Sequence, residues 1–173
     1  SDAVIHESNG EWNLVGDPTE GALVVLAMKG GVDIEGTRAS HRRIAEVPFD
    51  STLKFMVTFH RIATTSGTEV VRMFVKGAPD VILDRSTTVI GRGGSALTMQ
   101  ENHAQLLDHN NRLADEGMRV IAIAQRDLTI EAWNEFVLIM RERLGDSNLP
   151  GFPIWADHWV HIDDLKIPRG TPE

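Results

Sequence analysis

The chain has 173 residues, no cysteine and a formal net charge of −8, and 42% of its residues are hydrophobic. The missing cysteines exclude disulfides and thiolate chemistry, and the acidic balance argues against nucleic acid, whose binding proteins usually present a basic face. The length suits one globular core, so we expect a single domain over residues 1–173.

The first predicted element is a helix over residues 17–29. It starts with an N-cap, a proline at the first helical position and a capping-box glutamate, namely Asp17, Pro18 and Glu20, and a Gly-Gly pair ends it. Its apolar run, residues 22–28, is far shorter than the roughly 20 residues of a membrane span, so we expect no membrane insertion by this chain.

A β region follows. Residues 44–49 read as a short extended segment in which Pro48 marks an edge strand or the end of a strand. Residues 53–60 alternate, with Leu53, Phe55, Val57 and Phe59 on one face and Lys54, Met56, Thr58 and His60 on the other. A turn at 64–68 and a returning strand at 69–76 complete an antiparallel hairpin.

The second half continues the mixture of helices and strands. In chain order we expect a short helix at 80–85, a turn at 92–95, a helix at about 100–116, a buried strand at 119–126, a helix at 130–144, a loop at 145–153 and a strand at 159–162. The helix at 100–116 offers Leu106, Leu107, Leu113 and Ala114 to the core. This pattern is typical of an α+β fold, a twisted antiparallel sheet flanked by helices.

Two segments have the chemistry of a ligand site. Phe49 lies beside a turn, where an aromatic ring can stack on a flat base for about 1–3 kcal/mol. In the run Lys76-Gly77-Ala78-Pro79, small residues leave room for a ligand beside a cation. The alternatives are a core Phe49 with a solvated Lys54, and a plain strand-to-helix turn.

Two single residues could add to such a site. Arg119 can grip phosphate oxygens in a bidentate manner, although a surface ion pair is the better explanation of a single arginine. Glu20 could accept a hydrogen bond from an amine, although the capping box already accounts for it.

Four runs of sequence, in this order, resemble the nucleotide-binding (N) domain of P-type cation-transporting ATPases, most closely the calcium-pump and sodium-pump branch. They are Gly16-Asp17-Pro18-Thr19-Glu20, Pro48-Phe49-Asp50-Ser51 with Lys54, Lys76-Gly77-Ala78-Pro79, and Gly117-Met118-Arg119-Val120-Ile121-Ala122. The resemblance covers about residues 2–127 and fades beyond about residue 145.

The resemblance implies an ATP site with a role for each residue. Phe49 would stack on adenine, and Glu20 would accept a hydrogen bond from the adenine edge. Lys54, Lys76 and Met56 would line the pocket. Gly77 and Ala78 would form its close wall, and Arg119 would contact the phosphates. Ser51 stands where muscle-type calcium pumps have an arginine, so we expect the contacts to the phosphates to depend more on Arg119. Asp80 replaces the glutamate that usually follows Lys-Gly-Ala-Pro.

The resemblance also implies what lies outside the chain. The sequence contains no Asp-Lys-Thr-Gly-Thr, Thr-Gly-Glu-Ser or Walker A motif, so we expect no catalytic residue here. The domain would position ATP for transfer of its terminal phosphoryl group to an aspartate on a separate phosphorylation domain. That domain would also provide most of the contacts to the Mg²⁺. Its partners would be the phosphorylation and actuator domains of a membrane pump, on the cytoplasmic side, and the soluble isolated chain would bind ATP without hydrolysing it.

Two other functions fit the same residues. One is an interaction domain that kept the fold and lost the nucleotide, and the other is a free-standing phosphotransferase or hydrolase. A metal site at His158, His161 and Asp163-Asp164 is not expected, because strand residues three apart face opposite sides.

Overall fold

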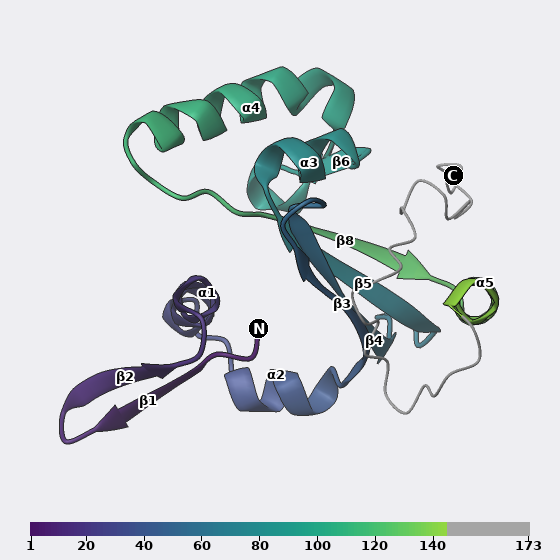
Figure 1. The fold of residues 1–173 in the computed structure, drawn as a ribbon, viewed down its shortest axis with the longest axis horizontal. Coiled ribbons are helices and arrows are strands. Elements are labelled where there is room, and N and C mark those ends of the chain that lie inside the picture. The colour runs from purple at the N-terminus through teal and green to yellow at the C-terminus, as the bar shows by residue number, and fades with distance from the viewer. Residues whose placement is uncertain (145–173) are drawn as a thin grey trace. The chain divides into compact units, whose positions relative to one another are not determined.

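The computed structural model describes residues 1–144, which form two compact units, Ser1–Arg42 and a second that begins at Arg43 (Figure 1). The predicted loop at 145–153, the strand at 159–162 and the two histidines near it lie outside the described residues. Among the described helices, none combines the length and the apolar character that crossing a membrane requires.

The first unit consists of a β-hairpin and two helices. Strands β1 (Val4–Ser8) and β2 (Glu11–Val15) are antiparallel, and helices α1 (Pro18–Lys29) and α2 (Ile34–Ser40) follow. The turn of the hairpin is Asn9-Gly10, with φ values of 55° and 80°. Asn-Gly is a strong hairpin signal, yet our sequence analysis did not predict this hairpin or α2.

Helix α1 confirms the predicted helix over 17–29. The Asp17 carboxylate accepts hydrogen bonds from the main-chain N–H groups of Thr19 and Glu20, at 2.8 and 3.1 Å. At the other end, the Gly30 N–H donates to Leu26 O at 3.0 Å. These bonds satisfy main-chain groups that helix ends leave unpaired.

The second unit is built on a four-stranded antiparallel sheet in the order β3-β4-β5-β8. The strands are β3 (Arg43–Asp50), β4 (Phe55–Ala63), β5 (Glu69–Gly77) and β8 (Ala122–Leu128). Strands β4 and β5 form the predicted hairpin, and β3, with Pro48, is an edge strand. The prediction placed the start of β8 at Arg119, three residues too early. This arrangement confirms the α+β class.

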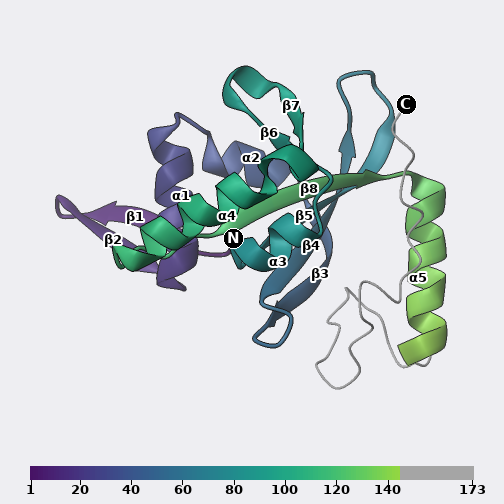
Figure 2. The ribbon, with the colours of Figure 1, turned by 90° about the horizontal axis from the view of Figure 1, so that it is seen from above.

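One face of this sheet carries the core, as the alternation over 53–60 predicted. Phe55, Val57 and Phe59 are almost fully buried there. Helices α3 (Pro79–Asp84) and α5 (Ile130–Leu144) contribute Ile82, Trp133 and Phe136 to the same cluster. Figure 2 shows α5 beside the far end of β8.

The opposite face, which we call the second face, follows from the strand registers. It carries Met56, Thr58 and His60 of β4, Arg72, Phe74 and Lys76 of β5, and Ile123, Gln125 and Asp127 of β8. These residues are half-buried or exposed rather than buried.

A hairpin and a long helix lie between β5 and β8. Strands β6 (Thr88–Ile90) and β7 (Ala96–Thr98) enclose the predicted turn, and α4 (Met99–Asp115) packs against α3. The prediction that α4 supplies Leu106, Leu107, Leu113 and Ala114 to the core is wrong. None of these four is buried, and the one buried residue of α4 is Met99, because the helix meets the rest of the unit through its first turns.

Candidate functional site

The turn from β3 to β4 is held together by one carboxylate. Asp50 Oδ1 accepts hydrogen bonds from the N–H groups of Thr52 and Leu53, both at 2.8 Å, and Lys54 N donates to Asp50 O at 2.7 Å. An aspartate that bonds the backbone two or three residues ahead is a common turn-forming device. Ser51 is exposed at the start of this turn.

Lys54 closes the turn in an uncommon conformation. Its φ is 60°, in the left-handed region that few non-glycine residues adopt. The prediction that Lys54 lies on the strand face of Met56 is therefore wrong, since Lys54 precedes β4 and the alternation starts at Phe55. The turn sets the direction of this side chain instead.

Phe49 is an exposed aromatic residue on the edge strand β3. Its exposed fraction is 60%, which excludes the alternative that it is a core residue. A large apolar ring left in solvent beside a rigid turn is available for stacking on a planar ligand.

The run Lys76-Gly77-Ala78-Pro79 joins β5 to α3 and contacts the Lys54 turn. Gly77 lies opposite Phe55 in the register, and Ala78 N donates to Lys54 O at 2.9 Å. A β-carbon on Gly77 would overlap Lys54 O and the Phe55 backbone. Glycine is thus required here by the protein's own backbone, whereas our sequence analysis explained it by the approach of a ligand.

Lys76 lies in a cross-strand row on the second face. It pairs with Met56 on one side and with Ile123 on the other. Lys76 and Met56 are half-buried, and Ile123 has an exposed fraction of 61%. Ile123 was not among the predicted site residues, although the alternation within residues 119–126 puts it on one face with Gln125.

Arg119 lies in the extended segment that leads into β8. Helix α4 ends just before it, where Gly117 N and Met118 N donate to Ala114 O and Leu113 O, both at 2.9 Å. Because Ala122 pairs with Gly77, the chain enters β8 from the end of the sheet that holds the Lys76-Gly77-Ala78 run. Arg119 is exposed and precedes the strand, which corrects its predicted position at the strand start.

Glu20 belongs to the first unit. Its carboxylate accepts a hydrogen bond from Asp2 N at 2.8 Å. A role for Glu20 beside Phe49, which belongs to the second unit, stays a prediction.

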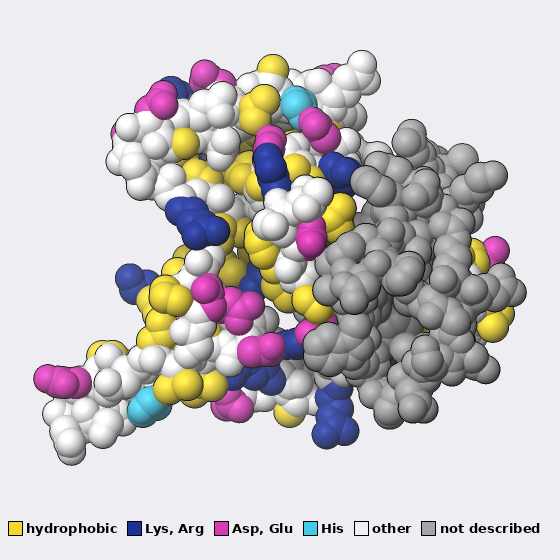
Figure 3. Space-filling model, viewed as in Figure 1, with side chains coloured by type: hydrophobic (Ala, Val, Ile, Leu, Met, Phe, Trp, Pro, Cys, Tyr) yellow, Lys and Arg dark blue, Asp and Glu magenta, His cyan; other side chains and the backbone are white. Residues whose placement is uncertain are grey.

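Two ion pairs involve charged side chains near the candidate residues. Lys54 Nζ lies 3.4 Å from Asp80 Oδ2. Further along the second face, Arg72 donates to both Asp127 oxygens at 2.6 and 2.8 Å, and this hydrogen bonding raises the pKa of Arg72 above its ordinary value. Figure 3 shows Asp and Glu side chains interspersed with Lys and Arg on the face it draws. On this face, an anionic ligand would therefore be attracted by individual cations rather than by a broad basic patch.

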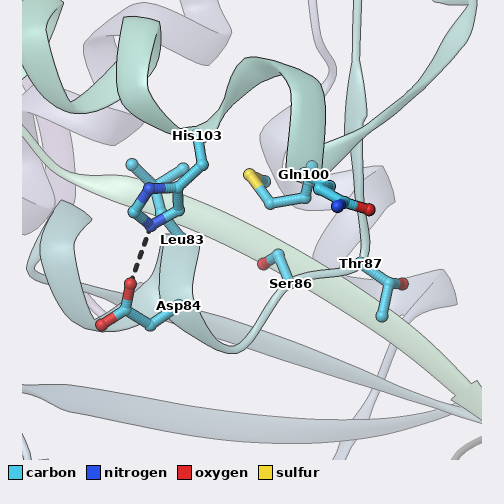
Figure 4. A pocket seen from close by; sticks show the side chains of 7 residues that line it. Leu83, Asp84, Ser86, Thr87, Gln100 and His103 are labelled. Carbon is cyan, nitrogen blue, oxygen red and sulfur yellow. Dashed lines mark hydrogen bonds and ion pairs between the residues drawn. The ribbon is translucent and has the colours of Figure 1, made fainter.

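A separate hollow lies between α3 and α4 (Figure 4). It has a volume of about 480 Å³ and is lined by Leu83, Asp84, Ser86, Thr87, Met99, Gln100 and His103. His103 Nε2 and Asp84 Oδ1 are 2.7 Å apart across it, which ties the two helices together. None of the predicted site residues lines this hollow. Among the side chains that the structure describes, no three His, Asp and Glu are grouped to hold a metal ion.

The structure thus brings several of the predicted site residues together within the second unit. Lys54, Gly77 and Ala78 are in direct contact, and Met56 and Lys76 are paired across strands. Phe49 and Ser51 lie at the start of the same connection between strands.

The model of the family described as "P-type ATPase, cytoplasmic domain N" matches residues 1–146. The chain is 37% identical to a calcium-transporting ATPase of Bacillus subtilis over 124 residues, which are 72% of this chain and 14% of that protein. It is 34% identical to the probable cation-transporting ATPase F of Mycobacterium tuberculosis, over 70% of this chain and 13% of that protein. It is 36% identical to the calcium-transporting ATPase type 2C member 1 of Pongo abelii, over 72% of this chain and 13% of that protein. The matched part therefore spans about one-seventh of the length of these relatives.

Proposed function

This chain belongs to the family of the P-type ATPase cytoplasmic N domain, and we propose that it binds ATP and positions it for phosphoryl transfer to an aspartate outside the chain. The parent protein would be an ATP-driven cation pump of the calcium type, a class that the names of several relatives support. The domain would lie on the cytoplasmic side of the membrane and would work with the phosphorylation and actuator domains of that pump.

The observation that carries this proposal is the position of Phe49. Its ring is exposed on β3, directly before the turn that ends at Lys54, and Lys54 is bonded to the Lys76-Gly77-Ala78 run. A stacking ring and two lysines near one end of a sheet suit a nucleotide, which needs a flat apolar contact for its base and cations for its phosphates.

Each residue of the proposed site has a distinct role. Phe49 stacks on adenine, Met56 and Lys76 line the pocket on the second face, and Gly77 and Ala78 form its wall. Arg119 grips the phosphate chain, because Ser51 offers no positive charge for the phosphates.

In this reaction, one domain can bind the nucleotide while another domain carries the group that reacts with it. Phosphoryl transfer is catalysed almost entirely by positioning and charge stabilisation. The chain would supply the positioning, while the neighbouring domain would supply the aspartate and most of the contacts to the Mg²⁺ that accompanies ATP.

Titration of the ¹⁵N-labelled chain with ATP and with adenosine tests the proposal. We expect shifts of the amide signals of Phe49, Lys76 and Arg119 with both ligands, larger at Arg119 with ATP, and no release of phosphate. Absence of shifts at all three would favour an interaction domain without nucleotide. Turnover of ATP that survives Lys76→Ala would instead indicate a free-standing hydrolase.

A further inference from the structure

The proposed ATP site contains an anion of its own, the carboxylate of Asp80. This residue lies in the first turn of α3, and its Oδ2 is 3.4 Å from Lys54 Nζ. The two side chains are about equally exposed, at 52% and 54%. A solvent-borne anion can therefore reach the same ammonium group.

The two partners are held near each other by the backbone. Lys54 N donates to Asp50 O, and Lys54 O accepts from Ala78 N, two residues before Asp80. The main chain of Lys54 is thus bonded on both sides, so its ammonium changes partner by rotation of the side chain alone. Short links of this kind lower the conformational entropy that the ion pair loses.

We propose that Asp80 is a positioning residue that holds the Lys54 ammonium beside the site until a phosphate group of the nucleotide replaces it. This inference rests on the proposed function and adds a control of affinity to it. Exchange is expected rather than addition, because a carboxylate and a phosphate next to one ammonium repel each other. Asp80 would then weaken the binding of nucleotides while keeping Lys54 close to its working position.

The exchange predicts the direction in which the affinity for ATP changes when Asp80 loses its charge. An exposed ion pair changes an equilibrium constant by about 1.5- to 5-fold, so Asp80→Asn is expected to tighten ATP binding by about 2- to 5-fold. Adenosine has no phosphate to receive Lys54, and its affinity is expected to stay the same. Asp80→Glu keeps the carboxylate and is expected to bind ATP within about 2-fold of the original chain.

A double-mutant cycle separates exchange from a general charge effect. The dissociation constant of ATP is measured by calorimetry for the original chain, Asp80→Asn, Lys54→Met and the double variant. With Lys54→Met, which keeps the apolar stem, the effect of Asp80→Asn is expected to vanish. Asp84→Asn removes the same charge from the same helix but is paired with His103, and it is expected to leave ATP affinity unchanged. Thermal melting checks that each variant is folded.

Three results would overturn the inference: no gain in ATP affinity with Asp80→Asn, an equal gain in the Lys54→Met background, or an equal gain with Asp84→Asn. If the original chain binds ATP and any of these is found, only the exchange is wrong. If the original chain binds neither ATP nor adenosine, the proposed function fails together with it.

Discussion

Gly77 lies so close to Lys54 that a β-carbon on residue 77 would overlap the main-chain oxygen of Lys54 and stand 2.6 Å from the Phe55 β-carbon. The contact joins the turn before β4 to the last residue of β5. It also holds the main chain of Lys54 close to the strand end that carries Lys76.

Gly77→Ala is expected to destabilise the chain by about 1–3 kcal/mol, because the added carbon meets backbone that cannot rotate away. It should also weaken ATP binding, since the Lys54 turn has to move. Gly67→Ala is the comparison: its φ is 82° and nothing lies within 4 Å, so it adds backbone strain without a clash. Denaturant unfolding and ATP titration of both variants check this, and unchanged ATP affinity in Gly77→Ala would contradict it.

Phe49→Ala is expected to weaken ATP binding by about 1–3 kcal/mol, the range for loss of one stacked base. Stability should change little, because the side chain is 60% exposed. Trp12→Ala, an equally exposed aromatic of the first unit, is a matched control that should bind ATP as before. Calorimetric titration decides, and equal affinities for Phe49→Ala and the original chain would remove the stacking role.

Trp133→Ala is expected to cost about 3–5 kcal/mol of unfolding free energy. The indole ring packs 5.0 Å from Phe59 and 5.6 Å from Phe136, centroid to centroid, and anchors α5 to the sheet. Leu138→Ala on the same helix removes a side chain that is 58% exposed and should stay within about 0.5 kcal/mol. A small loss for Trp133→Ala in urea unfolding would show that α5 is not part of the cooperative core.

Thr129→Ala is expected to destabilise α5 by about 0.5–2 kcal/mol, because Thr129 Oγ1 accepts from Ala132 N at 3.1 Å. Thr129→Ser keeps the hydroxyl and should retain most of the stability. Urea unfolding of the two variants measures the difference, and equal losses would argue against the cap.

The same helix start predicts a pH dependence. The Glu131 carboxylate accepts hydrogen bonds from its own N–H and from the Thr129 side chain, and these bonds lower the pKa of Glu131 below its ordinary value. A lowered folded-state pKa means that this stabilisation is present above the unfolded value and is lost as the pH falls through the folded value. Glu131→Gln should therefore be less stable than the original chain near neutral pH, with the difference disappearing as the pH falls through the folded-state pKa of Glu131. A difference independent of pH would assign the effect to something other than this carboxylate.

Much of the secondary structure could be predicted because its signals are local. The alternation of Phe55, Val57 and Phe59 indicated which face of β4 is buried, and the Asp17 cap indicated where α1 begins. Side chains two residues apart in a strand share a face whatever the rest of the chain does.

Other features depend on contacts that periodicity does not encode. The four leucine and alanine positions of α4 have a helical spacing, yet only Met99 is buried, because burial depends on what the helix meets. Ile123 became a candidate residue only when the register placed it opposite Lys76.

The sequence by itself determined the α+β class, the hairpin from β4 to β5 and the residue types of the proposed ATP site. Only the tertiary structure decided that Phe49 is exposed, that Lys54 leaves the strand and faces Asp80, and that Gly77 makes room for backbone. The reason is physical: helix caps and alternating faces depend on neighbouring residues, whereas a contact between residues 54 and 77 depends on the register of two strands and the turn that ends them.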